Sequence, residues 1–351
     1  MNVVHVVGTG TIGEPLIGML ARNREALGIE EVTFHKRTPL AEEKGKLDAL
    51  LRAGARLSTD AERWAEFHAL GHAPAYETQE ALERATVVVD CTPAGLENKA
   101  RWYARASGPR GFIAQGSERS FGKAYARGVN DRALAAGEDR FIHVVSCNTH
   151  NIAALVRSLG LDAEGRSQLL DGRFVCLRRA NDVSQDEEFV ASPTVGKHED
   201  ARFGTHHARD AHDLFTTLGL ELPLWSSSLK LPTQYMHTIW FSLTLDRPIT
   251  LDEVRARLRQ NPHVALTRKR SANRVFSFGR DHGIYGRILN QTVIPVDALA
   301  VRGGREVVGV CFTPQDGNSL LSSVAATLWL IDPETYQKRV ATLDPFLFRE
   351  V

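Results

Sequence analysis

A glycine loop near the N-terminus is the feature that most constrains the fold. Residues 2–7 (NVVHVV) are mostly β-branched and predict a strand, and the loop from Gly8 to Gly13 (GTGTIG) follows directly and opens a helical pattern. In this context Gly8 permits a tight turn, Gly10 lets the backbone approach a pyrophosphate, and Gly13 lets the helix pack on the strand. The loop predicts a dinucleotide site, with the phosphate at the helix N-terminus. A glycine-rich turn without a ligand is the alternative.

Strands and helices alternate through the first 146 residues. Short apolar strands are predicted at residues 32–34, 86–90, 112–114 and 142–145, and residues 40–55 have the composition of a solvated helix. Alternating strands and helices favour a parallel sheet that is covered by helices on both faces. We therefore expect an α/β protein with a Rossmann-type, doubly wound parallel sheet.

The pattern changes after about residue 150. Longer strands are predicted at residues 172–179 and 236–245, and the second alternates as a half-buried antiparallel strand does. Thr250 is the expected N-cap of a helix over 250–261, residues 183–213 are expected to form a long polar loop, and residues 319–331 return to a helical pattern. The 351 residues suit two domains. We predict an NAD(P)-binding domain over 1–146, completed by 319–351, and an α+β catalytic domain over 147–318 with a mainly antiparallel sheet.

The charge balance and the cysteines limit the partners. There are 43 Lys and Arg against 42 Asp and Glu, so the formal net charge of +1 predicts no bulk attraction to nucleic acid or to an anionic membrane. The N-terminal run has no basic n-region or cleavage site, and the apolar stretch 324–331 is too short to span a bilayer. The 4 cysteines have no CxxC spacing, which favours free thiols in a reducing cytoplasm.

The end of the second strand indicates which nucleotide binds. His35, Lys36 and Arg37 stand where an NAD site usually has Asp or Glu. Two cations suit a ribose 2′-phosphate, so NADP is favoured and NAD remains a second option. The alternative is a solvated basic turn.

A cysteine follows the strand predicted at 142–145. Cys147 lies between Ser146 and Asn148, at the expected start of a helix. The free N–H groups and the dipole at such a position lower a thiol pKa, which favours the thiolate that attacks an aldehyde carbon. Cys91, Cys176 and Cys311 lie in apolar runs and are expected to be packed as small hydrophobic residues.

These features, taken with five further segments, resemble the archaeal-type (type II) glyceraldehyde-3-phosphate dehydrogenases. The phrase Ser-Cys-Asn-Thr at 146–149 resembles that family's cysteine motif, and the glycine loop matches as well. The other similar segments, in the same order, are DCTPAG with NK at 90–99, QGSE at 115–118, LRRA at 177–180, HHARD at 206–210 and PTQYMH at 232–237.

The resemblance implies a function. The nucleophile Cys147 would attack a phosphorylated aldehyde, with His237 as general base and NADP or NAD as hydride acceptor. Inorganic phosphate would release the thioester as an acyl phosphate, reversibly, in a cytoplasmic homotetramer of glycolysis or gluconeogenesis. The implied cofactor-binding residues are Gly8, Gly10, Thr11, Ile12, Gly13, Lys36, Arg37, Thr92, Pro93, Gly95, Gln115 and Gly116. The implied substrate and phosphate residues are Ser146, Asn148, Thr149, Arg178, Arg179, His206 and His207, and no metal is expected.

Some of these roles have structural alternatives. His237 lies near the start of an apolar strand, where a packed, hydrogen-bonded histidine is common. Adjacent strand residues point to opposite faces, so only one of Arg178 and Arg179 can readily face a given pocket. A metal clip at His206 and His207 would need a third ligand at suitable spacing, and the sequence offers none.

The chain also departs from the family pattern. His150 and Asn151 replace a Thr and a Gly after the cysteine motif, Ala208-Arg209 replaces Gly-Pro, and the late Pro-Glu-Asn best matches residues 295–297, without its Asn. The exact substrate therefore stays open. A semialdehyde dehydrogenase or an acyl-phosphate reductase is one alternative. The other is a catalytically idle redox sensor or RNA-binding relative, suggested by basic residues 268–270 and 274 interleaved with Phe276 and Phe278.

Overall fold

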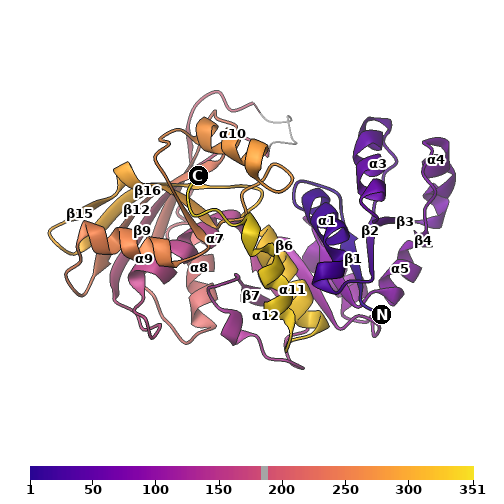
Figure 1. Ribbon diagram of the computed structural model, residues 1–351, viewed down its shortest axis with the longest axis horizontal. Coiled ribbons are helices and arrows are strands. Elements are labelled where there is room, and N and C mark those ends of the chain that lie inside the picture. Colours follow the sequence, from indigo (N-terminus) through magenta and orange to yellow (C-terminus); the bar gives the residue numbers. More distant parts are fainter. Residues whose placement is uncertain (183–188) are drawn as a thin grey trace. The chain divides into compact units, whose positions relative to one another are not determined.

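A computed structural model describes residues 1–182 and 189–351 (Figure 1). The chain divides into two compact units. Unit 1 comprises residues 1–125, 134–144 and 320–344, and unit 2 comprises residues 126–133, 145–319 and 345–351. The chain therefore leaves unit 1 and returns to it at its C-terminal part. The predicted α/β class is confirmed.

Unit 1 is built on a parallel sheet of eight strands in the order β4-β3-β2-β1-β5-β6-β8-β7. Each predicted strand is present, and further short strands extend both edges. The bounds are β1 (Val3–Val7), β2 (Glu31–His35), β3 (Arg56–Thr59), β4 (Tyr76–Glu77), β5 (Val87–Asp90), β6 (Gly111–Gly116), β7 (Lys123–Tyr125) and β8 (Phe141–Val145). Central strands β1 and β5 are buried almost throughout, as their valine-rich sequences predict.

Unit 1 also contains helices, of which α11 and α12 come from the C-terminal part of the chain. Their bounds are α1 (Gly13–Arg22), α2 (Arg24–Leu27), α3 (Lys44–Arg52), α4 (Trp64–Ala69), α5 (Thr78–Arg84), α6 (Gly95–Asn98), α11 (Leu320–Ile331) and α12 (Tyr336–Val340). Every residue of α11 is buried, and the helix packs against α1, β5 and β6 of its own unit (Figure 1). Its apolar sequence thus belongs to a core helix. None of the helices within the described ranges is long and apolar enough to cross a membrane.

Unit 2 is built on a mixed, mainly antiparallel sheet in the order β10-β11-β9-β12-β16-β14-β13, with β15 beside β16. Only the β11–β9 and β13–β14 pairs are parallel among its described pairings. The strands are β9 (Leu169–Arg178), β10 (Thr194–Val195), β11 (Leu224–Lys230), β12 (His237–Leu245), β13 (Val264–Thr267), β14 (Thr292–Pro295), β15 (Ala300–Arg302) and β16 (Glu306–Thr313).

The helices of unit 2 are α7 (Cys147–Leu155), α8 (His206–Thr216), α9 (Leu251–Gln260) and α10 (Ala272–His282). The Thr250 hydroxyl accepts the Glu253 N–H, which confirms the predicted N-cap of α9. The long loop predicted over 183–213 is confirmed at 189–205, apart from the two-residue strand β10, and is wrong from His206 on, where α8 begins. Residues 183–188 of that prediction lie outside the described residues. The apolar face of α8 is interrupted by His and Asp, which hid its helical period from the sequence.

Candidate active site

The candidate nucleophile lies at the start of α7. Strand β8 ends at Val145 and α7 begins at Cys147, with Ser146 as the N-cap residue. The Ser146 hydroxyl accepts the Thr149 N–H at 3.4 Å and lies 2.9 Å from the Thr149 hydroxyl. Two of the predicted substrate residues therefore build the cap that holds the thiol in place. Cys147 itself is partly exposed.

The acidity of this thiol differs from the sequence prediction. Burial is the main cause that raises the pKa of Cys147 to about 11; the charge of Arg179 opposes it, and the charges of Asp316 and Asp182 act in the same direction as burial. The backbone N–H of Asn148 also lowers the pKa, as expected at a helix N-terminus. The predicted low pKa is wrong, because the loss of hydration around the thiol outweighs the effect of the helix N-terminus.

His237 is the first residue of β12, which runs antiparallel to both β9 and β16. Its ring is buried, and its Nδ1 accepts the backbone N–H of Arg179 at 2.9 Å. Burial, followed by the charges of Arg179 and Arg178, holds the pKa of His237 well below the usual value. The imidazole is therefore neutral near pH 7. Because Nδ1 accepts a hydrogen bond, the ring hydrogen is on Nε2.

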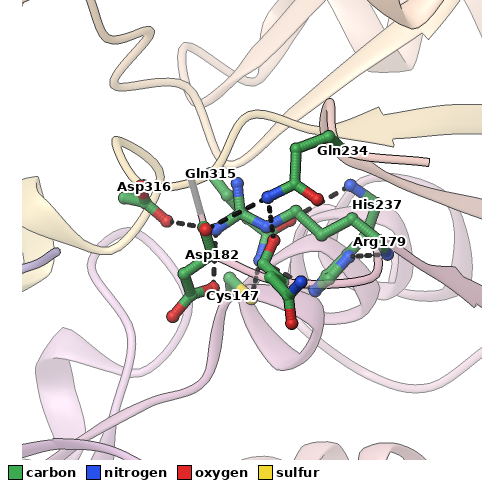
Figure 2. Close-up of polar contacts among 8 residues, drawn as sticks. Cys147, Arg179, Asp182, Gln234, His237, Gln315 and Asp316 are labelled. Atoms are coloured by element: carbon green, nitrogen blue, oxygen red, sulfur yellow. Dashed lines mark hydrogen bonds and ion pairs between the residues drawn. The ribbon is translucent and has the colours of Figure 1, made fainter. Parts of the chain in front are cut away.

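A third side chain, Gln315, lies beside both groups, and the sequence did not indicate it (Figure 2). Its amide nitrogen donates to the Cys147 sulfur at 3.2 Å and lies 2.7 Å from Nε2 of His237. Its oxygen accepts the backbone N–H of His237 at 3.1 Å. The polar run QDGN at 315–318, between a strand and a helix, is the only signal that could have drawn attention to it.

The same loop is fixed to its surroundings by two further residues. The Asn318 amide donates to the Cys147 carbonyl at 2.8 Å, and the Asp316 carboxylate accepts from Arg179 Nη2 at 2.8 Å. Burial raises the pKa of Asp316, although Arg179 opposes this. The segment after β16 thus forms one wall of the thiol site, whereas residues 295–297, matched to the late Pro-Glu-Asn, end β14 and enter a short 3₁₀ turn.

The two predicted arginines have opposite environments, as the strand geometry requires. Arg178 is exposed, and its charge lowers the pKa of His207 and His237. Arg179 is buried, and its Nη2 also donates to Asp182 at 2.7 Å (Figure 2). Among the described residues, its Nε and Nη1 have no hydrogen-bond partner. The side chain of Arg179 therefore fixes the loop that bears Gln315, by its bond to Asp316. The backbone N–H of Arg179 fixes the ring of His237.

His206 and His207 begin α8, and their rings stack with centroids 4.0 Å apart. His206 is exposed, whereas His207 is buried and its Nδ1 lies 3.1 Å from the Thr205 hydroxyl. Burial is the main cause that lowers the pKa of His207 well below the usual range. No group of three or more His, Cys, Asp or Glu is placed to hold a metal ion anywhere in residues 1–182 and 189–351.

The glycine loop of unit 1 has the geometry that a pyrophosphate needs. Gly8 has a φ of 93°, and a Cβ on Gly13 would meet the Gly8 carbonyl oxygen at 2.1 Å. A Cβ on Gly10 would meet nothing within 4 Å, so the backbone there is open to an approaching ligand. Thr11 and Ile12 lead into α1, and Ile12 makes no side-chain cap bond. The residues thus fit a nicotinamide dinucleotide, with its pyrophosphate at the N-terminus of α1.

The two basic residues after β2, Lys36 and Arg37, differ in burial and in their contacts. Lys36 is buried and forms an ion pair with Glu43, which also binds Lys46. Arg37 is exposed. The acid that faces the lysine comes from the next element and not from the end of β2, so the sequence around 35–37 could not show it.

The segment after β5 is organised by Asp90. One carboxylate oxygen accepts from the Thr92 N–H at 2.9 Å and its hydroxyl at 2.6 Å, and the other accepts from Asn98 at 2.7 Å and Tyr103 at 2.8 Å. Pro93 is exposed at the turn. Gly95 is buried, and a Cβ there would lie 3.1 Å from Ala114 and Glu118.

Gln115 and Gly116 end β6 within the same unit. The Gln115 amide donates to the Ser323 hydroxyl at 2.9 Å and accepts from it at 3.1 Å, so this side chain is held by α11. The Gly116 carbonyl lies 2.8 Å from Nε2 of His143, and Gly116 has a φ of 64°. The residues predicted for the cofactor are thus gathered in unit 1, and those predicted for the substrate are gathered in unit 2.

Curated proteins of similar sequence bear on the family. A glyceraldehyde-3-phosphate dehydrogenase of Pyrobaculum islandicum is 26% identical over 315 residues, which cover 86% of this chain and 85% of that protein. The enzyme of the same name from Metallosphaera sedula is 27% identical, with 86% and 85% covered. The resemblance to archaeal glyceraldehyde-3-phosphate dehydrogenases is confirmed. Glyceraldehyde-3-phosphate dehydrogenase 1 of Methanosarcina barkeri is 24% identical over 79% of this chain and 78% of its own length. No protein-family model matches the chain.

The departures from the motifs of these archaeal dehydrogenases lie in two kinds of environment. His150 is fully buried with Nδ1 3.0 Å from the Ser146 carbonyl, and the Asn151 amide donates to the Thr313 hydroxyl at 2.8 Å. The side chains of His150 and Asn151 are therefore part of the packing of α7. Arg209 is partly exposed in the first turn of α8, and its charge acts on His206. Arg209 is therefore the departure that changes the charge beside His206.

The basic run at 268–270 is not accompanied by free aromatic rings. Phe276 and Phe278 pack against the buried cluster that contains Met236 and Val275, and Phe278 stacks edge-on with Phe348 at 5.0 Å. Lys269 lies over the Phe278 ring at 5.0 Å. Aromatic side chains engaged in a core do not offer a stacking surface to bases. Packing against the buried cluster thus explains Phe276 and Phe278, the aromatic residues that suggested RNA binding.

Proposed function

We propose that this chain is a phosphorylating glyceraldehyde-3-phosphate dehydrogenase that oxidises a phosphorylated aldehyde with NADP or NAD. One observation carries the proposal: Cys147, at the N-terminus of α7, shares the Gln315 amide with the neutral ring of His237. A thiol and a neutral histidine that contact the same amide group suit the formation and oxidation of a thiohemiacetal. The similarity to archaeal dehydrogenases over 86% of the chain supports the same reaction.

In the proposed reaction, the Cys147 sulfur adds to the aldehyde carbon. The nicotinamide cofactor, when bound, accepts the hydride from that carbon. His237 faces the substrate oxygen with Nε2 in the proposal, and the partly buried site limits the access of water to the thioester. Inorganic phosphate then attacks the thioester carbon, the C–S bond breaks, and the acyl phosphate leaves while Cys147 is restored.

We place the anionic groups on the cations around α8 and β9. Arg178 and His206 are exposed, and His207 lies beside them, so these residues bind the phosphate groups in the proposal. Ser146, Asn148 and Thr149 shape the start of α7. Arg179 already neutralises two carboxylates, and we assign it to positioning Gln315 and His237.

We place the cofactor on unit 1. Gly8, Gly10 and Gly13 would hold the pyrophosphate, with Thr11 and Ile12 at the N-terminus of α1. The other proposed contacts are Thr92, Pro93, Gly95, Gln115 and Gly116. Arg37, the exposed cation after β2, favours NADP over NAD, because Lys36 is held by Glu43.

We further propose a homotetramer in the cytoplasm. The cysteines are free, which suits a reducing compartment. One face of the unit 2 sheet carries Trp240 opposite Val175 and Val310, and Trp240 is 36% exposed. Such an apolar sheet face suits contact with a second copy of the chain. Trp240→Glu should lower the mass measured by light scattering, and an unchanged mass would count against this face.

The test of the function is reduction of NADP and of NAD by glyceraldehyde 3-phosphate, followed by absorbance. The native chain, Cys147→Ser and the matched control Cys176→Ala are each assayed with and without inorganic phosphate. We expect phosphate-dependent NADPH formation that falls at least about 1,000-fold in Cys147→Ser and persists in Cys176→Ala. Activity without phosphate would indicate a hydrolytic aldehyde dehydrogenase, and activity only with carboxylated aldehydes would indicate a semialdehyde dehydrogenase.

A further inference from the structure

The hydrogen-bond donors around Cys147 outnumber the acceptors. The Gln315 oxygen accepts the backbone N–H of His237, which turns the two amide hydrogens of Gln315 toward the Cys147 sulfur and the His237 ring. In that ring, Nδ1 accepts the backbone N–H of Arg179, so a neutral imidazole carries its hydrogen on Nε2. The amide of Gln315 and Nε2 of His237 therefore present N–H groups to each other across 2.7 Å.

Neither side chain can remove this donor–donor contact by reorienting. Exchanging the oxygen and nitrogen of the Gln315 amide would satisfy Nε2, but would place the amide N–H against the backbone N–H of His237. Moving the ring hydrogen to Nδ1 would oppose the N–H of Arg179. The loop is also held by Arg179 through Asp316 and by Asn318 at the Cys147 carbonyl. One acceptor is lacking in every arrangement of these groups.

An oxygen atom bonded to the carbon that Cys147 attacks would supply that acceptor. We propose that the Gln315 amide and the Nε2–H of His237 form an oxyanion-binding pair beside Cys147. The proposal rests on the proposed function for its substrate, an aldehyde. It assigns Gln315 a catalytic role, because its amide touches the attacking sulfur.

The step is balanced without a proton transfer. The sulfur, after its proton has left to solvent, donates an electron pair to the aldehyde carbon; the C–S bond forms, and the π pair of the carbonyl moves onto oxygen. The oxyanion accepts hydrogen bonds from Gln315 and His237, which strengthen as its charge develops. When that pair re-forms the C=O bond, the hydride leaves to the nicotinamide. His237 thus acts at Nε2 as a hydrogen-bond donor while the sulfur attacks.

The first test needs no substrate and uses the full chain. Gln315→Glu keeps the size of the side chain and the acceptor for the His237 N–H, but removes the donor to sulfur. We expect alkylation of Cys147 by iodoacetamide at pH 8 to slow about tenfold, since loss of a hydrogen bond to the thiolate raises the thiol pKa by about one unit. The matched control is Gln234→Ala, whose amide donates to the carbonyls of Asn181 and Asp182. Equal rates in Gln315→Glu and the native chain would overturn the role of Gln315.

The second test separates a donor from a base at position 237. His237→Gln keeps an N–H donor at the end of the side chain but cannot accept a proton, whereas His237→Leu has neither property. With glyceraldehyde 3-phosphate and NADP, we expect kcat/KM to fall at most about tenfold in His237→Gln and about 100- to 1,000-fold in His237→Leu. Equal, large losses in both variants would overturn the donor role. If the native chain oxidises no aldehyde, the proposed function fails, while the alkylation rates still decide the role of Gln315.

Discussion

The glycine loop of unit 1 is complete within residues 8–13, whereas the thiol site of unit 2 draws its four central residues from positions 147, 179, 237 and 315. In unit 1 the backbone itself is the binding element, so a short run of glycines specifies it. In unit 2 the site depends on strand register, because β9, β12 and the end of β16 bring these side chains together. The comparison teaches that the two sites should respond to different kinds of change.

Backbone substitutions should affect unit 1 most strongly. Gly13→Ala places a Cβ 2.1 Å from the Gly8 carbonyl oxygen, and backbone atoms cannot easily move away. We expect a loss of at least about 3 kcal/mol in the free energy of unfolding, measured by urea titration. Gly10→Ala meets nothing within 4 Å and should fold normally, yet bind NADP about tenfold more weakly. Equal free energies of unfolding in the two variants would contradict this expectation.

Acidification should affect unit 2 more than unit 1. Burial lowers the pKa of His5 in unit 1 to about 3 and that of His263 in unit 2 to about 4; His207 and His237, also in unit 2, are lowered well below the usual value. The unfolded chain binds these protons near pH 6.5, so stability is present above that pH and is lost as the pH falls toward the folded pKa values.

Each such histidine should remove roughly 2 kcal/mol between pH 6.5 and pH 5. Because unit 2 holds more of them, we expect it to unfold first. Urea titrations at pH 7 and pH 5, followed by circular dichroism, measure the total loss, and brief proteolysis with mass spectrometry identifies the unit that opens. Earlier opening of unit 1 at pH 5 would contradict the expectation.

The nucleotide preference should depend on a single exposed side chain of unit 1. Arg37→Ala removes the proposed partner of the 2′-phosphate, so KM for NADP should rise about tenfold, or about 1.4 kcal/mol, while KM for NAD stays unchanged. Arg52→Ala, which removes an exposed arginine at the end of α3, is the matched control. A parallel rise for both nucleotides would show that Arg37 acts on the fold and not on the phosphate.

The smallest effect is a charge effect within the thiol site. Asp316 raises the pKa of Cys147, so Asp316→Asn should lower it, by less than about one unit, and speed alkylation at pH 8. Asp182→Asn should act in the same direction, because its carboxylate raises the same pKa. Slower alkylation in either variant would mean that the loop has moved. The neighbouring substitutions at 315 and 316 should thus change the thiol in opposite directions.

Much of the fold could be predicted from local patterns. The valine runs of β1 and β5, the alternation of β12 and the Thr250 cap each depend on neighbours in sequence, and the structure has all of them. Helix α8 was missed because polar residues line its buried face. Strand geometry also predicted that Arg178 and Arg179 would have different surroundings, but not that Arg179 would be the buried one.

The site was less predictable because its chemistry depends on long-range contacts. Cys147 and His237 stood out through short motifs, but the raised pKa of the thiol results from burial by segments that are distant in sequence. Gln315 carries no motif, and only the pairing of His237 with Thr313 at the end of β16 brings it to the sulfur. The Glu43 partner of Lys36 was likewise hidden in the next helical segment.

The position of α11 has a consequence for synthesis on the ribosome. Residues 1–125 emerge first, yet the helix that covers β5 and β6 and holds Gln115 through Ser323 is made only after residue 319. Until then, the apolar face that α11 buries stays open to water. By then, most of the residues of unit 2 have been synthesised. We expect the first-made part of the protein to complete its folding last, and to depend on chaperones in the interval.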